Sequence, residues 1–272
     1  MCSDEPNPIR RLTAADIAQA GELSTAAGWN QTNDDWARFI ALAGESCFGI
    51  DSEGALAATG GAVCYSRALA WVGMVLTRPD CRGRGFATHI MRHTVEHLDA
   101  RGVECVKLDA TEMGHELYRR LGFQEESRVE RWLRPAGSKP RAALAGFQMD
   151  RALDREAFGA DRSALLGELA RLEAVSISGA GYAMGRPGRL AAYFGPCVAT
   201  SAEAARAFLE WHLARHGDEP VFWDIPVDNG AAVALAREYG FEPRRRLVRM
   251  RRGAGVRHDA SRIYALAGFE FG

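Results

Sequence analysis

At 272 residues, the chain is long enough for one large domain or for two domains of ordinary size. Its composition, 47% hydrophobic and 25% charged, is typical of a soluble globular protein, and its formal net charge of −1 argues against general affinity for nucleic acid or anionic membranes. No apolar run approaches the roughly 18 residues of a membrane-spanning helix, and the polar start MCSDEPNPIRRL lacks a signal-peptide core. We therefore expect a cytoplasmic protein whose partners include neither nucleic acid nor a membrane.

Hydrophobic periodicity and turn residues predict strands and helices in mixed order over the first 150 residues. Thr13 is the expected N-cap of the first helix, Gly28 is its expected end, and Trp36 and Phe39 are expected to face inward from the second helix. This order predicts an α/β fold with one mixed sheet flanked by helices. The expected strands are 9–12, 47–51, 56–65, 70–77, 105–110, 124–134 and 143–149, and the expected helices are 14–26, 34–43, 86–98 and 114–121.

The six cysteines, at positions 2, 47, 64, 81, 105 and 197, form no C-x-x-C pair and have no histidine at a spacing typical of metal sites. We expect reduced thiols, no disulfide and no structural metal.

The stretch Ala70–Leu98 joins a buried strand to an amphipathic helix through a turn rich in glycine and arginine. The first N–H groups of a helix have no partner inside it, and the helix dipole favours negative charge there, so such a junction can bind an anion. A plain tight turn is the alternative. The dinucleotide fingerprint fails because Thr88 stands where its third glycine belongs, and no Gly-Lys-Ser/Thr occurs for a P-loop.

Two motifs make this junction more specific. Arg82 to Ala87 matches Arg-x-x-Gly-x-Ala, and Leu117 to Phe123 reads LYRRLGF. In this order, with a helix and a strand between them, the two motifs resemble the pyrophosphate loop and the "LYxxxGF" segment of the GCN5-related N-acetyltransferases (GNAT). The resemblance implies direct attack of an acceptor amine on the thioester of acetyl-CoA, without a covalent enzyme intermediate.

The resemblance also implies roles for residues of this chain. Tyr118 matches the tyrosine that protonates the leaving thiolate, whereas its alternative role is that of a half-buried helix residue. Thr111 stands where the family often has asparagine, which leaves its contact with acetyl-CoA open. The strand before the loop pairs with the pantetheine amides in this family, and the loop binds the pyrophosphate; the residues concerned are Val75, Leu76 and Thr77, and Arg82, Gly83, Arg84, Gly85, Phe86, Ala87 and Thr88.

The general base and the acceptor site are less defined. Many relatives use a glutamate on the strand before the loop, but that strand has no titratable residue here. Asp109, Glu112, His115 or a water molecule can serve instead. The acceptor is expected near the segment between the first two helices, with Trp29 as a pocket wall or a core residue, and with Asn30 and Asp109 as further candidates.

The second half of the chain repeats the first. Ala143–Phe147 (ALAGF) recurs as Ala265–Phe269, and Gly122-Phe123 recurs as Gly240-Phe241 with an offset of 118. We therefore predict two tandem domains of the same fold, residues 1–149 and 150–272. The offset pairs three residues of the first site with poor replacements, since Arg82 corresponds to Thr200, Gly85 to Glu203 and Tyr118 to Ala236.

A glutamate repels pyrophosphate, so the second domain is predicted to be degenerate. Its role is structural support or homodimerisation, or else a wall of the acceptor pocket. The arginine-rich segment 244–252 alternates with apolar residues, which favours a sheet strand over an anion-binding face or a nucleic-acid patch.

The sequence therefore predicts an N-acetyltransferase that acts on the amine of a small molecule, with the working site in the first domain. The alternatives are an acyl-CoA sensor without catalysis and a protein or peptide N-acetyltransferase.

Overall fold

The computed structural model describes residues 8–272, and its strands form one continuous mixed sheet. The strands are β1 (Ile9–Arg11), β2 (Cys47–Ser52), β3 (Ala55–Cys64), β4 (Ala70–Thr77), β5 (Cys105–Ala110), β6 (Gln124–Arg134), β7 (Glu173–Ile177), β8 (Gly181–Arg186), β9 (Ala192–Ala199), β10 (Val221–Pro226), β11 (Glu242–Gly253) and β12 (Ile263–Ala265). The helices are α1 (Ile17–Ala26), α2 (Asn33–Ala43), α3 (Phe86–Ala100), α4 (Glu112–Arg120), α5 (Arg151–Phe158), α6 (Ser163–Ala170), α7 (Ala202–His216) and α8 (Gly230–Glu238). Short 3-10 turns cover Ala14–Asp16, Gly44–Ser46, Pro79–Cys81 and Ala260–Arg262.

The predicted α/β fold is confirmed, and most elements lie where the sequence placed them. Thr13 and Thr32 form capping boxes before the first two helical segments. Each threonine hydroxyl accepts a backbone N–H of the first turn, and the aspartate three residues later accepts the backbone N–H of the threonine. Trp36 and Phe39 are fully buried, as predicted, and the ring of Phe39 packs against Phe271 at 5.9 Å. One apolar core therefore includes residues from both ends of the chain. No helix within residues 8–272 is long and apolar enough to cross a membrane.

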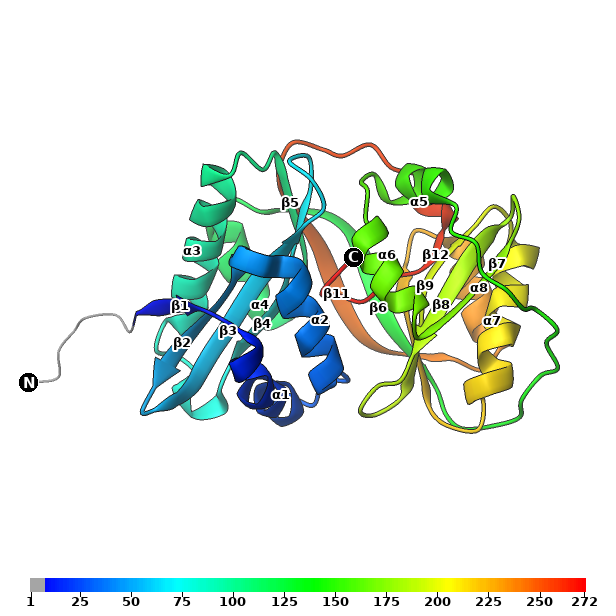
Figure 1. Cartoon of the computed structure of the whole chain (residues 1–272), viewed down its shortest axis with the longest axis horizontal. Coiled ribbons are helices and arrows are strands. Elements are labelled where there is room, and N and C mark those ends of the chain that lie inside the picture. The colour runs from blue at the N-terminus through cyan, green and yellow to red at the C-terminus, as the bar shows by residue number, and fades with distance from the viewer. Residues whose placement is uncertain (1–7) are drawn as a thin grey trace, which may run out of the picture.

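The two halves of the chain interlock through their strands. The sheet order is β1-β2-β3-β4-β5-β11-β6-β10-β9-β8-β7, so β11 from the second half lies between β5 and β6 of the first. In return, β6 pairs with β10 of the second half. Figure 1 shows two lobes joined by this central pair, β6 in green and β11 in orange.

The interlocking of the two halves explains why the strand predicted at residues 143–149 does not form. Residues 143–149 contain no strand; Gly146 accepts a hydrogen bond from the Ser176 N–H, and the N–H of Gln148 donates to the Ser176 hydroxyl. Both sides of β6 are already occupied by β11 and β10, so no sheet edge is available beside it. The two ALAGF segments are therefore repeated in sequence and not in structure. The first copy contains no strand, and only Ala265 of the second copy lies in one.

Two buried ion pairs link the strands that the halves exchange. Arg131 of β6 donates two bonds of 2.7 Å to Asp224 of β10, and Arg249 of β11 donates bonds of 2.9 and 3.0 Å to Asp109 of β5. The two arginines are 118 positions apart, which is the offset of the repeat. The pairs thus occupy equivalent places on the two sides of the β6–β11 ladder.

Because Asp224 is fully buried, Asp224→Asn leaves Arg131 without a charged partner. We expect the substitution to lower the free energy of unfolding by about 3–5 kcal/mol, as for other broken buried pairs. Urea unfolding measures the loss. Glu130→Gln on the same strand is the control, because its partner Arg246 is mostly exposed and such pairs contribute about 0–1 kcal/mol. Equal effects of the two substitutions would contradict this account.

Candidate functional site

A cleft opens where β4 and β5 diverge. The two parallel strands pair only at Ala70 with Val106 and at Trp71 with Lys107, and β5 then continues along β11. Beyond Trp71, one edge of β4 faces a cavity of about 810 Å³ instead of a neighbouring strand. The starts of α3 and α4 line the same cavity. The predicted residues Val75, Leu76 and Thr77 lie along this wall.

A bulge in β4 lies on the same wall. Met74 has a φ of +55°, which is rare for a residue with a side chain, and the β3–β4 register shifts between Thr59 and Gly61. The hydroxyl of Thr59 donates a 2.8 Å bond to the Met74 carbonyl, which supports the distorted backbone. Strain of this kind concentrates at functional sites. No sequence pattern indicated it.

The loop after β4 ends at the N-terminus of α3. Gly83 and Gly85 have φ values of +77° and +82°, and an added Cβ at either position would meet nothing within 4 Å. Backbone conformation therefore requires glycine at both positions, and their surroundings are open. Gly85 is the N-cap without a side-chain bond, so the N–H groups of residues 86–88 have no partner inside the helix. This open N-terminus fits an anionic group such as a pyrophosphate.

The predicted loop residues do not all reach the cavity. Arg82, Gly83 and Gly85 line it, together with Phe86, Ala87 and Thr88. Arg84 is not among the lining residues; its guanidinium lies over the Phe86 ring at 4.9 Å and 3.9 Å from Glu53. A contact of the Arg84 guanidinium with pyrophosphate therefore needs a change of its side-chain position.

Tyr118 lies on α4 at the cavity wall, with only 9% of its surface exposed. Burial raises its pKa to about 12, so the phenol keeps its proton at neutral pH. Gly114 packs on the ring, and a Cβ there would come within 2.8 Å of the Tyr118 Cε2 atom. The hydroxyl of Thr111 accepts the Gly114 N–H at 3.3 Å and caps α4.

The other end of the cavity has polar groups that the sequence did not indicate. Glu270, near the C-terminal end, lines the cavity and is 3% exposed; its pKa is raised by burial. It accepts bonds from Gln31 Nε2 at 3.1 Å and from Arg186 at 3.3 Å. A carboxylate accepts and does not donate, so Gln31 turns its Nε2 toward Glu270. Its Oε1 is buried without a partner among the described residues.

A glycine allows Glu270 to reach this position. A Cβ at Gly73 of β4 would lie 2.7 Å from the Glu270 Cα atom, so the C-terminal segment crosses β4 at a position that has no room for a side chain. The indole of Trp71 donates to the Phe269 carbonyl at 3.0 Å and Tyr65 donates to the Phe271 carbonyl at 2.6 Å, which fixes the crossing. The second half thus forms a wall of the first half's cavity.

The three residues expected to contact the acceptor differ in whether they line the cavity. Trp29 lines the cavity. Asn30 does not, because its side chain donates to the Ala191 carbonyl and accepts the N–H groups of Leu190 and Ala191. Asp109 is at the cavity wall, but both carboxylate oxygens accept bonds from Arg249. The Asn30 amide therefore supports the fold and does not line the cavity, and its contact with an acceptor stays a prediction.

Glu112 and His115, the other candidates for the general base, differ in whether they reach the cavity. Glu112 lines the cavity and is exposed, whereas His115 lies outside the lining and pairs with Glu125 at 2.7 Å.

The equivalent junction in the second half is closed. Ser201 caps α7 by accepting the Ala204 N–H at 3.2 Å, and Glu203 stands in the first turn. β9 and β10 diverge after Phe194 and Trp223, but β12 lies in the space between them. It pairs with β9, and the Trp223 indole donates to the Tyr264 carbonyl at 2.8 Å. A strand of the chain itself thus occupies the place of the first half's cavity.

The arginine-rich segment became the central strand β11, as the alternation predicted. Its side chains pair with carboxylates on the neighbouring elements; examples are Arg246 with Glu130, Arg251 with Glu126 and Arg252 with Asp99.

Comparison with known proteins agrees with the fold. Two models described as acetyltransferase (GNAT) domains match residues 8–125 and 151–265. The chain belongs to the GNAT family of N-acetyltransferases. It contains two GNAT domains, and the family implies acetyl-CoA as the acetyl donor.

Relatives extend this assignment without naming an acceptor. An uncharacterized N-acetyltransferase of Methanocaldococcus jannaschii is 35% identical over 71 residues, which cover 25% of this chain and 31% of that protein. A candidate acetyltransferase of Pyrococcus horikoshii has a similar structure, with a TM-score of 0.84 at 22% identity over 97% of this chain and 95% of that one. A GCN5-related N-acetyltransferase of Sphaerobacter thermophilus follows, with a TM-score of 0.67 at 16% identity over 93% and 98%. At these identities the two structures support the fold alone.

Proposed function

We propose that this GNAT protein transfers the acetyl group of acetyl-CoA to the amine of a small molecule, at the β4–β5 cleft of its first domain. One observation carries the proposal: the cleft beside the glycine loop is open in the first half, whereas β12 fills its counterpart in the second. The division into domains near Asp150 is part of the same proposal. A small acceptor is favoured because Phe269 and Glu270 from the C-terminal segment wall the cavity.

In this proposal, the N–H groups at the start of α3 and the Arg82 guanidinium bind the pyrophosphate. The backbone of Val75, Leu76 and Thr77 faces the cleft and pairs with the pantetheine amides. This arrangement directs the thioester toward the end of the cavity that Trp29 lines.

The amine nitrogen then attacks the thioester carbon, the carbon–sulfur bond breaks, and the sulfur leaves with the electron pair. Tyr118 donates a hydrogen bond to the developing thiolate. Its pKa of about 12 lies above that of a thiol, so the phenol acts chiefly as a neutral donor and regains from solvent any proton it gives up.

The amine must lose a proton during the reaction, and we propose Glu270 as the acceptor of that proton. It is a carboxylate at the cavity wall with a pKa raised by burial, which makes it a stronger base than an exposed glutamate. The unpartnered Oε1 of Gln31 offers the amine a second hydrogen-bond acceptor.

The loop assignment predicts that Gly85→Glu weakens acetyl-CoA binding by on the order of 100-fold or more, because a carboxylate would stand at the anion site. Isothermal titration calorimetry measures the dissociation constant. Gly240→Glu is the matched control, because Gly240 also has a positive φ and open surroundings but lies outside the cavity. Unchanged affinity in the Gly85 variant would contradict the loop assignment.

Tyr118→Phe is expected to lower kcat by about 10²–10⁴-fold and to leave the dissociation constant of acetyl-CoA nearly unchanged, because the hydroxyl acts on the leaving group. Thiol release from acetyl-CoA with panels of small amines and peptides measures turnover. Tyr239→Phe, in the second half, is the control. A wild-type protein that binds acetyl-CoA and releases no thiol with any amine would favour a sensor, and turnover only with peptides would favour peptide acetylation.

Glu270→Gln is expected to lower kcat/KM by about 10²-fold and to change its pH dependence. A base acts in its ionised form, so the wild-type rate rises as pH increases through the raised pKa of Glu270, and the variant lacks this limb. Glu112→Gln, an exposed carboxylate at the same cavity, is the control and should keep the wild-type profile. A Glu270 variant that retains the limb would exclude this carboxylate as the base.

A further inference from the structure

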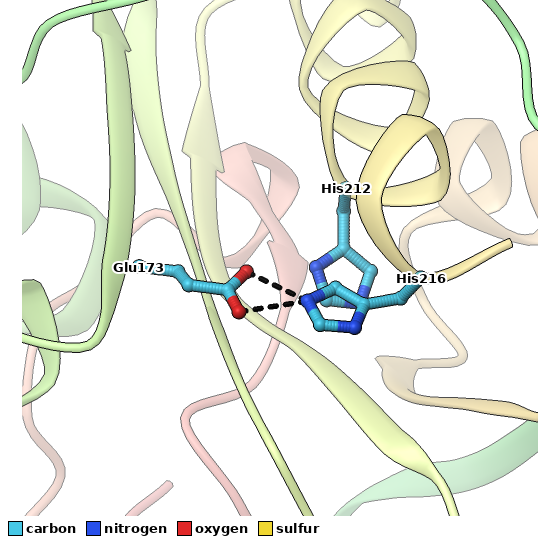
Figure 2. A group of neighbouring side chains, drawn as sticks. All are labelled: Glu173, His212 and His216. Atoms are coloured by element: carbon cyan, nitrogen blue, oxygen red, sulfur yellow. Dashed lines mark hydrogen bonds and ion pairs between the residues drawn. The ribbon is translucent and has the colours of Figure 1, made fainter. Parts of the chain in front are cut away.

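Two histidines and a glutamate converge in the second half, away from the β4–β5 cavity. His212 and His216 are four residues apart on α7, which places them on the same face of the helix. Glu173 begins the neighbouring strand β7, and Figure 2 shows its carboxylate directed at the two rings. One ligand atom from each residue lies within 4.8 Å of the others.

His212 is the unexplained member of this group. Its side chain is fully buried, and neither ring nitrogen has a hydrogen-bond partner among the described residues. Its ring packs on Phe194 at 5.3 Å and on His216 at 4.8 Å. Buried polar groups are rarely left in this condition.

Both ring nitrogens of His216 have carboxylate partners, which fix the orientation of the ring. Its Nδ1 lies 2.7 Å from Glu219, and its Nε2 lies 2.7 and 2.9 Å from the two oxygens of Glu173. Carboxylates accept and do not donate, so both ring nitrogens of His216 donate an N–H in the metal-free structure. A metal ion at Nε2 would replace the proton on that nitrogen, while Glu219 keeps the N–H on Nδ1. Metal-binding histidines are oriented by the same kind of carboxylate partner.

A glycine makes the space for the cluster. Gly185 of β8 lies opposite Glu173 in the β7–β8 ladder. A Cβ at this position would come within 2.6 Å of the His212 Nδ1 atom and 3.0 Å of the Glu173 Oε2 atom. The φ of Gly185 is not in the positive range, so the packing of the cluster and not backbone conformation requires glycine here.

We propose that Glu173, His212 and His216 form a binding site for a divalent transition-metal ion, with Zn²⁺ as the best match. Two imidazoles and one carboxylate are a ligand set that zinc accepts, with bonds of about 2.0–2.2 Å. Tetrahedral bonds of that length separate the ligand atoms by roughly 3.4 Å, so side-chain shifts of about 1 Å suffice. Glu173 and His216 are partly exposed, which gives the ion an entry path and leaves its fourth position to solvent.

The ion would join the last turn of α7 to β7, the edge strand of the sheet. The sequence expectation of no structural metal rested on the cysteines, and it passed over the His-x-x-x-His spacing of residues 212–216. The competing account is a purely ionic cluster, in which His216 is an imidazolium between two glutamates and His212 is a buried neutral side chain.

The test uses the full-length protein after treatment with a chelator and dialysis. Calorimetry with Zn²⁺ is expected to give one site per chain, and Co²⁺ is expected to give the visible absorption of a tetrahedral nitrogen and oxygen site. At 100 times the dissociation constant, Zn²⁺ should raise the melting temperature by about 5–10 °C.

Glu173→Gln and His216→Asn should each remove the calorimetric site and the thermal shift. Glu219→Gln should weaken binding by about 10–100-fold, as expected for the loss of an orienting partner. His258→Asn, an exposed histidine elsewhere, is the matched control and should bind like the wild type. His212 is left unchanged because a substitution in the core can prevent folding.

Absence of wild-type binding would overturn the proposal and favour the ionic cluster. Undiminished binding by the Glu173 and His216 variants, or a sulfur-to-cobalt charge-transfer band indicating cysteine ligands, would overturn it as well.

Discussion

The pairing of β6 with β11 is the constraint on which the rest of the structure depends. Each of these strands follows the Gly-Phe pair of its own half and pairs with the last parallel strand of the other half. The equivalent ion pairs Arg131–Asp224 and Arg249–Asp109 hold these crossed positions, and all four side chains are almost entirely buried. Neither half can complete its sheet alone, so the two domains of the sequence form one folded unit.

The crossing also decides the course of the C-terminal segment. After β11 the chain returns to the second half as β12 and fills the cleft between β9 and β10, and it then crosses β4 at Gly73. Residues 263–270 thus close one cleft and wall the other. A duplicated fold has in this way acquired two different surfaces, one open to a ligand and one packed as core.

Loss of the second cleft leaves α7 without the anion-binding role that we propose for α3. Its N-terminus is capped by Ser201, and its other end carries the two histidines that face Glu173. The two equivalent helices therefore differ at both ends, although both pack on the sheet through apolar residues. The proposed metal site belongs to this divergence, because the equivalent end of α3 has His97 near Ser46 and no such cluster among the described residues.

The sequence by itself determined the local elements, the family resemblance and the loop. Periodicity and caps depend on neighbouring residues, so the bounds of β4, β5 and β6 follow from short-range chemistry. Only the tertiary structure decided which strand fills which gap, and hence that 143–149 is not a strand, that Asn30 is a structural residue, and that Glu270 lies beside β4. These outcomes depend on contacts between residues far apart in the sequence, such as Gln31 and Glu270, which are 239 positions apart. No local sequence pattern indicates such contacts.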